Sequence, residues 1–599
     1  MNPDIPLPSL DLGVIGNASA AALVDRQGAV VWMCAPRMDG DPVFCRLLDG
    51  VEPDGGDWSI TVDALAACQQ RYLRNTAVLE TVQTDANGNR LRIIDFAPRF
   101  KARGRVFRPL ALIRIVEPLE GAPRVRVRLR PRHGYGAHRP ETTRGTNHLR
   151  FILGDQVLRL TTDAPVEFVE HGTAFLVDRP HAFILGADER LEDAPMTVAQ
   201  DFLADTIAYW QDWVRYLSVP VDFQDVVIRS AITLKLCSHE ETGGIVAALT
   251  TSIPEYGESG RTWDYRFSWL RDSYFTVKAL NLLGATKTME DYLGYVSNVA
   301  AGSPDGYLQP LFGLGLERHI DEATVASLAG YRGHGPVRAG NAAYTQVQND
   351  GYGSVILSVI QYFFDERLPA AGDEGLFRRL EPLGTQAVRR WNQPDAGIWE
   401  FRTRNGVHTH SAMMCWAACD RLARIAARLG LTDRAGHWRG EAELIRAATL
   451  ELAWNERLES FTSTFGGADL DASLLLMPEI GIVAARDPRF LSTLAACEKN
   501  LRFGNHIYRY RAPDDFGEPE TAFTGCTFWL IDALARVGRH DDALAVFNDI
   551  LEHRNHLGLL SEGLHVDSGE LWGNFPQTYS MVGLINAAMR LSRRWENVL

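Results

Sequence analysis

Two glutamates lie in irregular segments of this 599-residue chain, where a carboxyl group can act as an acid or as a base. Glu400 lies in GIWEFR and Glu562 in LSEGLH, and neither segment has the periodicity of a helix or a strand. Trp399 directly precedes Glu400, and an indole beside a carboxyl group favours the neutral form that a general acid needs. One carboxylic acid and one carboxylate base are what a glycosidase requires. Alone, however, a loop glutamate beside a tryptophan is more often a surface residue or a cap.

Aromatic and charged residues are concentrated in two further segments without periodicity. In residues 260–272, GRTWDYRFSWLRD, the rings of Tyr265 and Trp269 can stack on sugars, and Arg271 and Asp272 can bond to hydroxyl groups. The other interpretation of this segment is a helix N-terminus at which Asp272 complements the helix dipole. Residues 507–520 contain two arginines, Arg509 and Arg511, together with aromatic and acidic side chains. These compositions are typical of a sugar-binding pocket.

The first two hundred residues predict strands. Residues 20–24 and 29–32 flank DRQG, and residues 78–84 and 90–96 flank DANGN. Both turns are hairpin signals, because Asn and Gly accept the positive φ that a tight turn needs. Strict alternation in RVRVRLR predicts a half-buried strand, and further short strands follow. We therefore expect an antiparallel β-sandwich.

The rest of the chain predicts helices in consecutive hairpins. Glycines at 284, 430 and 538 suit the position just after a helix, with Thr286 or Thr288, Thr432 and Asp541 as N-caps of the next helix. About twelve helices are expected, near residues 225, 272, 288, 347, 375, 410, 433, 472, 488, 523, 541 and 578. Twelve helices of this kind can close as an inner and an outer ring of six. The expected division is a β-sandwich over 1–198, a helical linker over 199–222 and a helical domain over 223–599.

The overall charge narrows the class of partner. Lys plus Arg number 61 against 75 for Asp plus Glu, which gives a net charge of −14. This balance argues against a nucleic acid or an anionic membrane and favours a small neutral ligand. Neither a secretory leader nor an apolar run of membrane-spanning length is recognised, so a cytoplasmic protein is expected. The oligomeric state stays open, a homo-oligomer included.

No cofactor or metal is expected from the motifs. The eight cysteines include no CxxC pair, and their thiols are expected to be reduced and buried. His408 and His410 have no acidic partner at ligand spacing, so solvent or capping roles are favoured over metal binding. The glycines of FGLGLE precede no strand and helix unit, which argues against a nucleotide cradle.

Six motifs in order resemble glycoside hydrolase family 15, which contains glucoamylases, glucodextranases and bacterial trehalases. They are WDYRFSWLRD, GYRGHGPVRAGNAA, GIWEFR, DASLLLMPEIG, TFWLIDALARVGR and SEGLHVDSGELWGNFPQ. The opening LGVIGNASAAALVDRQGAVVWMCAPRMDGDPVF also resembles the N-terminal domain of prokaryotic members, so the likeness covers nearly the whole chain. It implies an α+β multidomain fold: an N-terminal antiparallel β-sandwich, a helical linker and a C-terminal (α/α)6 catalytic barrel.

The resemblance also implies roles for single residues. Glu400 matches the general acid of the family and Glu562 its general base. The remaining matches are to the sugar pocket: Tyr265, Trp269, Arg271, Asp272 and Trp399, with weaker matches at Arg338 and Arg509. Two departures, Gly563 and Met581, stand where relatives often carry an acidic residue and a histidine, which leaves the subsites beyond the first glucose open.

The activity that these matches imply is that of an inverting, exo-acting α-glucoside hydrolase. It would release β-glucose from the non-reducing ends of short α-linked gluco-oligosaccharides, with trehalase activity as the alternative within the family. An inverting disaccharide phosphorylase needs an acid but no base, so Glu562 disfavours it. A sugar-binding protein without activity is also disfavoured, because both carboxylates are present.

Overall fold

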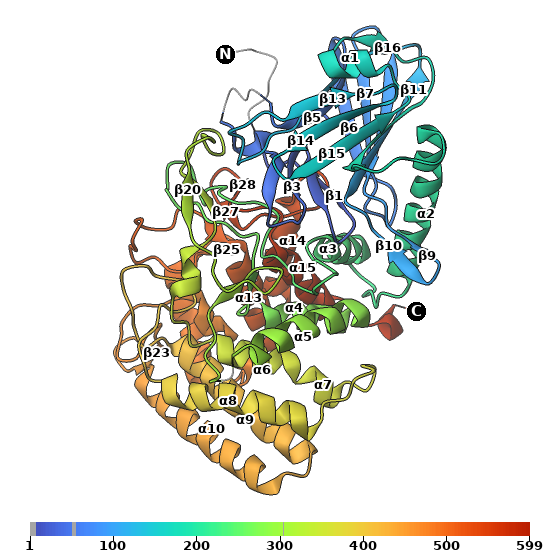
Figure 1. Cartoon of the computed structure of the whole chain (residues 1–599). Helices are drawn as coiled ribbons and strands as arrows, with labels where there is room; N and C mark the ends of the chain where they lie inside the picture. The colour runs from blue at the N-terminus through green and yellow to red at the C-terminus, as the bar shows by residue number, and fades with distance from the viewer. Residues whose placement is uncertain (1–7, 51–54, 304, 599) are drawn as a thin grey trace.

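The computed structural model describes residues 8–50, 55–303 and 305–598 of the chain. A β-rich part from the N-terminal third packs against a larger helical part, which Figure 1 shows with strands in blue and helices from green to red. The expected fold class is confirmed. The proposed boundaries at 198 and 222 remain proposals. Residues 1–7 of the first region and residue 599 of the last lie outside the described residues.

The β-rich part consists of two antiparallel sheets that enclose one apolar core. The predicted hairpins are present as the antiparallel pairs β2–β3 and β7–β8. One sheet has the order β1 (Gly13–Gly16), β2 (Ala21–Val24), β3 (Val30–Ala35), β5 (Asp57–Val62), β12 (Arg124–Arg130) and β16 (Phe175–Leu176), with β4 (Asp41–Phe44) on β3. The other has the order β13 (Glu141–Arg144), β14 (His148–Leu153), β15 (Gln156–Thr162), β17 (His181–Ala187), β11 (Ala111–Glu120), β8 (Arg90–Phe96), β7 (Leu79–Asp85) and β6 (Leu65–Tyr72).

The long helix α2 (Pro195–Arg215) connects the sandwich to the helical part. Apolar side chains along one side of it, among them Ala199 and Phe202, pack on the outer face of the eight-stranded sheet. The linker therefore also covers a sheet face that would otherwise expose apolar residues to water. No helix within the described ranges has both the length and the apolar composition needed to cross a bilayer.

The helical part forms two concentric rings. Each helix of the inner ring contacts the next, and the last contacts the first: α4 (Ser273–Leu282), α6 (Gly351–Val359), α9 (Thr409–Arg428), the short pair η3 (Ala472–Leu476) and α11 (Met477–Ile480), α13 (Thr524–Arg536) and α15 (Thr578–Leu591). The outer helices alternate with them along the chain: α3 (Gln224–Leu236), α5 (Thr286–Ala301), α8 (Glu374–Arg390), α10 (Thr432–Leu452), α12 (Pro488–Leu501) and α14 (His540–Glu552). This arrangement is the expected (α/α)6 barrel.

Contacts from the β-sandwich support the segment that precedes α4. The indole of Trp32 donates to the carbonyl of Leu249 over 2.8 Å. The buried guanidinium of Arg266 donates to the carbonyl of Gly40 over 2.7 Å and to the hydroxyl of Tyr135 over 2.9 Å. Because Arg266 follows Tyr265 directly, the N-terminal domain helps to hold one of the predicted site residues in place.

Glycine ends three of the helices as predicted, but the N-caps differ from the prediction. Gly284, Gly430 and Gly538 have φ of 68°, 75° and 92°. The amide of the next residue bonds back to the helix over 2.9 Å in each case: Ala285 to Leu280, Leu431 to Ala426, and Arg539 to Leu534. That residue is also the N-cap of the following helix, so Thr286, Thr432 and Asp541 lie inside the first turn instead of capping it.

Two glycines, one in the turn between α9 and α10 and one inside α10, allow a matched test of backbone conformation. An alanine at Gly430 would touch nothing within 4 Å, so its cost is the left-handed conformation alone, and we expect Gly430→Ala to destabilise the protein by about 1 kcal/mol. Gly436 also has open space but lies inside α10, where alanine is better than glycine by about 1 kcal/mol. Thermal unfolding should therefore shift down for Gly430→Ala and up for Gly436→Ala. Shifts of the same sign would contradict this account.

Candidate active site

A cavity of about 1150 Å³, a volume that includes solvent at its open mouth, lies where the irregular segments between ring helices meet. Seven of the nine sequence-predicted site residues line it: Tyr265, Trp269, Arg271, Asp272, Trp399, Glu400 and Arg509. The cavity is of the size that binds small organic ligands, and its walls combine aromatic rings with a few charged groups. The other two predicted residues, Glu562 and Arg338, lie outside this lining.

Glu400 is held by three hydrogen-bond donors on a single oxygen. Its Oε1 accepts from the indole of Trp269 over 2.7 Å, from Arg271 over 3.1 Å and from the amide of Gln348 over 3.2 Å. Oε2 accepts no hydrogen bond from the described residues. The backbone of Glu400 has φ of 58°, a left-handed conformation that a non-glycine residue rarely adopts. The carboxyl group is thus fixed at one oxygen and left available at the other.

The indole next to Glu400 in sequence is not the one that contacts its carboxyl group. Trp399 donates through Nε1 to Asp471 over 2.9 Å and packs edge-on against Tyr510, with ring centroids 5.8 Å apart. The contact to Glu400 comes instead from Trp269, far away in the chain. Trp399 remains part of the cavity wall, so its role there is to present an aromatic face.

Glu562 is almost completely buried, with 1% of its surface exposed. It immediately precedes β27 (Gly563–His565), which pairs with β26 (Ala522–Phe523) and β28 (Glu570–Trp572). Its Oε1 accepts from the hydroxyl of Tyr265 over 2.6 Å, and its Oε2 has no hydrogen-bond partner among the described residues. Gly573, with φ of 79°, lies against this carboxylate, and a Cβ there would come within 2.6 Å of Oε2.

The environment of Glu562 shifts its acidity. Burial, followed by the negative charge of Glu255, raises the pKa of the Glu562 carboxyl group above its usual range, while the Tyr265 hydroxyl and the charge of Arg509 oppose this. Arg509 binds both oxygens of Glu255, over 2.8 and 3.1 Å. Glu255 also lines the cavity, although the sequence analysis did not single it out. A raised pKa makes a carboxylate a stronger proton acceptor.

The carboxyl groups of Glu400 and Glu562 are hydrogen-bonded to two aromatic residues that contact each other. Tyr265, which bonds Glu562, and Trp269, which bonds Glu400, pack edge to face with their centroids 5.4 Å apart. Both rings come from one segment, held between the barrel and the β-sandwich. This single segment therefore sets the position of one glutamate relative to the other.

Arg271 is surrounded by acidic groups. It pairs with Glu400 over 3.1 Å and with Asp272 over 3.5 Å. Burial raises the pKa of Asp272 to about 6 and that of Asp350 to about 6, with Arg271 opposing the shift in both. Asp272 is the N-cap residue of α4, so it lies at a helix N-terminus as the alternative interpretation expected, although its side chain caps no amide.

Of the two roles expected for His408 and His410, exposure to solvent is excluded because both are buried. His408 is the N-cap residue of α9, although its side chain makes no capping hydrogen bond. His410 lines the cavity, and its Nδ1 lies 3.6 Å from Asp350. The ring of His408 stacks on Phe401 at 6.0 Å. His410 lies in the first turn of α9, which belongs to the inner ring.

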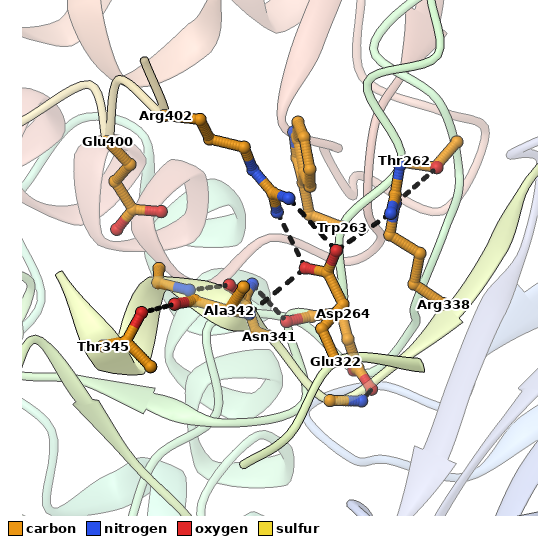
Figure 2. A network of polar contacts seen from close by, with 12 residues as sticks. Thr262, Trp263, Asp264, Glu322, Arg338, Asn341, Ala342, Thr345, Glu400 and Arg402 are labelled. Carbon is orange, nitrogen blue, oxygen red and sulfur yellow. Dashed lines mark hydrogen bonds and ion pairs between the residues drawn. The ribbon is translucent and has the colours of Figure 1, made fainter. Parts of the chain in front are cut away.

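Arg338 supports the cavity wall from behind. Glu322 accepts from Arg338 over 2.9 Å and from Arg402 over 2.7 Å. The indole of Trp263 lies next to both guanidinium groups, 5.3 Å from that of Arg338 and 4.3 Å from that of Arg402. Figure 2 shows this network beside Glu400. Arg402 and Trp263 line the cavity, so Arg338 acts through them.

Sequence comparison places the chain in a known group of proteins. Residues 221–589 match the family Glycosyl hydrolases family 15, and residues 7–177 match the domain Trehalase-like, N-terminal. A trehalase of Thermoplasma volcanium is 30% identical, over 97% of this chain and 93% of its own length. A trehalase of Mycobacterium tuberculosis is also 30% identical, over 98% and 90%.

The fold has a counterpart among solved structures. A bacterial glucoamylase complexed with acarbose superposes with a TM-score of 0.70 and covers 98% of this chain and 94% of its own, at 14% identity. The β-sandwich, the (α/α)6 barrel and an aromatic cavity lined by Glu400 and by Tyr265, which bonds Glu562, agree with the family match in identifying a glycoside hydrolase. The chain belongs to glycoside hydrolase family 15.

Proposed function

We propose that this enzyme is a trehalase, which hydrolyses α,α-trehalose with inversion at the carbon that water attacks. The relatives named trehalase match nearly the full chain, and these names favour the alternative considered in the sequence analysis over short α-glucans. The observation that carries the chemistry is that two separate carboxyl groups, those of Glu400 and Glu562, are hydrogen-bonded to Trp269 and Tyr265, two rings that line the same cavity.

Glu400 would act as the general acid. Three donors fix Oε1, so the transferable proton resides on Oε2, which is free to reach the glycosidic oxygen. Proton transfer to this oxygen lets the bond to the anomeric carbon break as glucose leaves. Arg271, joined to the same carboxyl group, would hold hydroxyls of the bound sugar together with Asp272.

Glu562 would act as the general base together with Tyr265. The hydroxyl of Tyr265 reaches the cavity and is hydrogen-bonded to Glu562, so a water beside it has a route for its proton to the carboxylate. The water oxygen then bonds to the anomeric carbon from the face opposite the leaving group. Arg509 and Glu255 flank this position and would contact the sugar or the water.

Contacts that join the segments of Arg261 and Arg402 to residues 514–515 narrow the cavity. A narrow cavity suits a disaccharide better than a long glucan chain. The backbone amide of Arg402 donates to Asp515 over 2.8 Å. Arg261 pairs with Asp514 over 2.6 Å, next to it. A long glucan would have to pass between these connected segments. Trehalose, with its two reducing ends joined, has no chain that continues beyond the second glucose.

Product stereochemistry tests the proposal. Inverting hydrolysis of α,α-trehalose yields one β-glucose from the attacked carbon and one α-glucose from the leaving half, whereas a retaining enzyme yields only α-glucose at first. Early proton NMR spectra should therefore show the two anomers in equal amounts. Turnover of trehalose, maltose and isomaltose is measured side by side with the same preparation. Faster turnover of maltose or isomaltose would overturn the trehalase assignment and would favour hydrolysis of short α-linked gluco-oligosaccharides.

The role of Glu400 predicts a dependence on the leaving group. Glu400→Gln should lower kcat on trehalose by about 10²- to 10⁴-fold, because the amide cannot donate the proton. With α-glucosyl fluoride, whose leaving group needs little protonation, the loss should be much smaller. Steady-state kinetics on both substrates measures this difference. Equal losses on both would remove Glu400 from the acid role.

The surroundings of Glu562 predict opposite shifts in pH dependence. A base acts only when ionised, so the acid limb of kcat/KM follows the pKa of the coupled groups around Glu562. Glu255→Gln removes a negative charge that raises this pKa, so the acid limb should move to lower pH. Tyr265→Phe removes a hydrogen bond that lowers it, so the limb should move to higher pH. Profiles that move in the same direction would contradict the assignment of the limb to Glu562.

A further inference from the structure

A second cluster of chemically active side chains lies away from the cavity, between the outer helix α14 and the hairpin strand β25 (His506–Ile507). Its members are His506, Asp549 and His553, and one ligand atom from each lies within 4.8 Å of the others. Asp549 and His553 are four residues apart at the end of α14, so they project from the same face of the helix. The proposed mechanism uses none of the three.

The geometry of His506 is unusual for an ordinary hydrogen bond. Its Nε2 lies 2.8 Å from Oδ2 of Asp549, yet this buried nitrogen has no hydrogen-bond partner of acceptable geometry within the described ranges. The side chain of His506 is 6% exposed. A buried imidazole nitrogen that lies beside a carboxylate without forming a hydrogen bond of acceptable geometry to it has a lone pair available for an ion.

The distances suit a small metal ion. Nε2 of His553 lies 3.8 Å from the same oxygen of Asp549, and the corresponding distance for His506 is 2.8 Å. Tetrahedral zinc with bonds of about 2.0–2.2 Å places its ligands roughly 3.3 Å apart, which falls between these two values. Asp549 and His553 are 29% and 30% exposed, so an ion can enter from solvent.

We propose that His506, Asp549 and His553 bind one zinc ion, with water completing the coordination. Two imidazoles and one carboxylate are a ligand set for zinc and similar transition metals, whereas magnesium and calcium prefer oxygen ligands alone. The ion would join two segments that lead into the active site. His506 lies three residues before Arg509, and His553 lies nine residues before Glu562.

The test uses the full-length enzyme after treatment with EDTA. Isothermal titration with zinc chloride should show one ion per chain, and saturating zinc should raise the midpoint of thermal unfolding by roughly 2–4 °C. Asp549→Asn and His553→Gln should each weaken zinc binding by more than the roughly 10- to 100-fold cost of losing a group outside the coordination shell. His553 is partly exposed, so His553→Gln is expected to fold normally even if Asp549→Asn does not.

His540→Gln provides the matched control, because His540 is an exposed histidine at the other end of the same helix. It should bind zinc as the unaltered enzyme does. The proposal is overturned if the unaltered enzyme binds no zinc, or if all three variants bind it equally. It is also overturned if magnesium chloride gives the same thermal shift as zinc chloride, since an ion that avoids nitrogen ligands would then be responsible.

Discussion

The edge-to-face contact between Tyr265 and Trp269 is the interaction on which the active site depends. Each ring carries a hydrogen bond to one glutamate, so the distance between the rings limits the distance between the two carboxyl groups. Both rings belong to a segment that is neither helix nor regular sheet over most of its length. Its shape therefore has to be imposed from outside, by the helices of the inner ring on one side and the β-sandwich on the other.

Charge balance is the second requirement of this arrangement. Glu400 and Asp272 pair with Arg271, and Glu255 pairs with Arg509. Burying so many carboxylates would be too costly without cations in contact with them. Burial still raises the pKa of Asp272 against the charge of Arg271, and it raises the pKa of Glu562 against the charge of Arg509. As a result, the site contains carboxyl groups whose pKa values are higher than those of exposed carboxyl groups.

Most of the architecture could be predicted from the sequence, because alternation and helical periodicity are local signals. The residues that line the cavity were also predicted where they lie in motifs, as for Glu400 and Arg271. Glu255 and Gln348 were missed, because a single glutamate or glutamine in a loop carries no pattern, and only the fold brings them to Arg509 and Glu400. Arg338 lies behind the lining of the cavity, beside Glu322 and Trp263, and a motif alone does not tell whether a side chain forms the wall or supports it.

The left-handed backbone at Glu400 has a consequence for how this enzyme can change. A residue with a Cβ costs about 1 kcal/mol or more in this conformation, and glycine avoids the cost. Loss of the carboxyl group through replacement by glycine would thus be accompanied by a gain in backbone stability. The same replacement would remove the three hydrogen bonds that Oε1 accepts and would leave Arg271 with one acidic partner fewer. The conformation of the backbone and the contacts of the side chain therefore favour different residues at this one position.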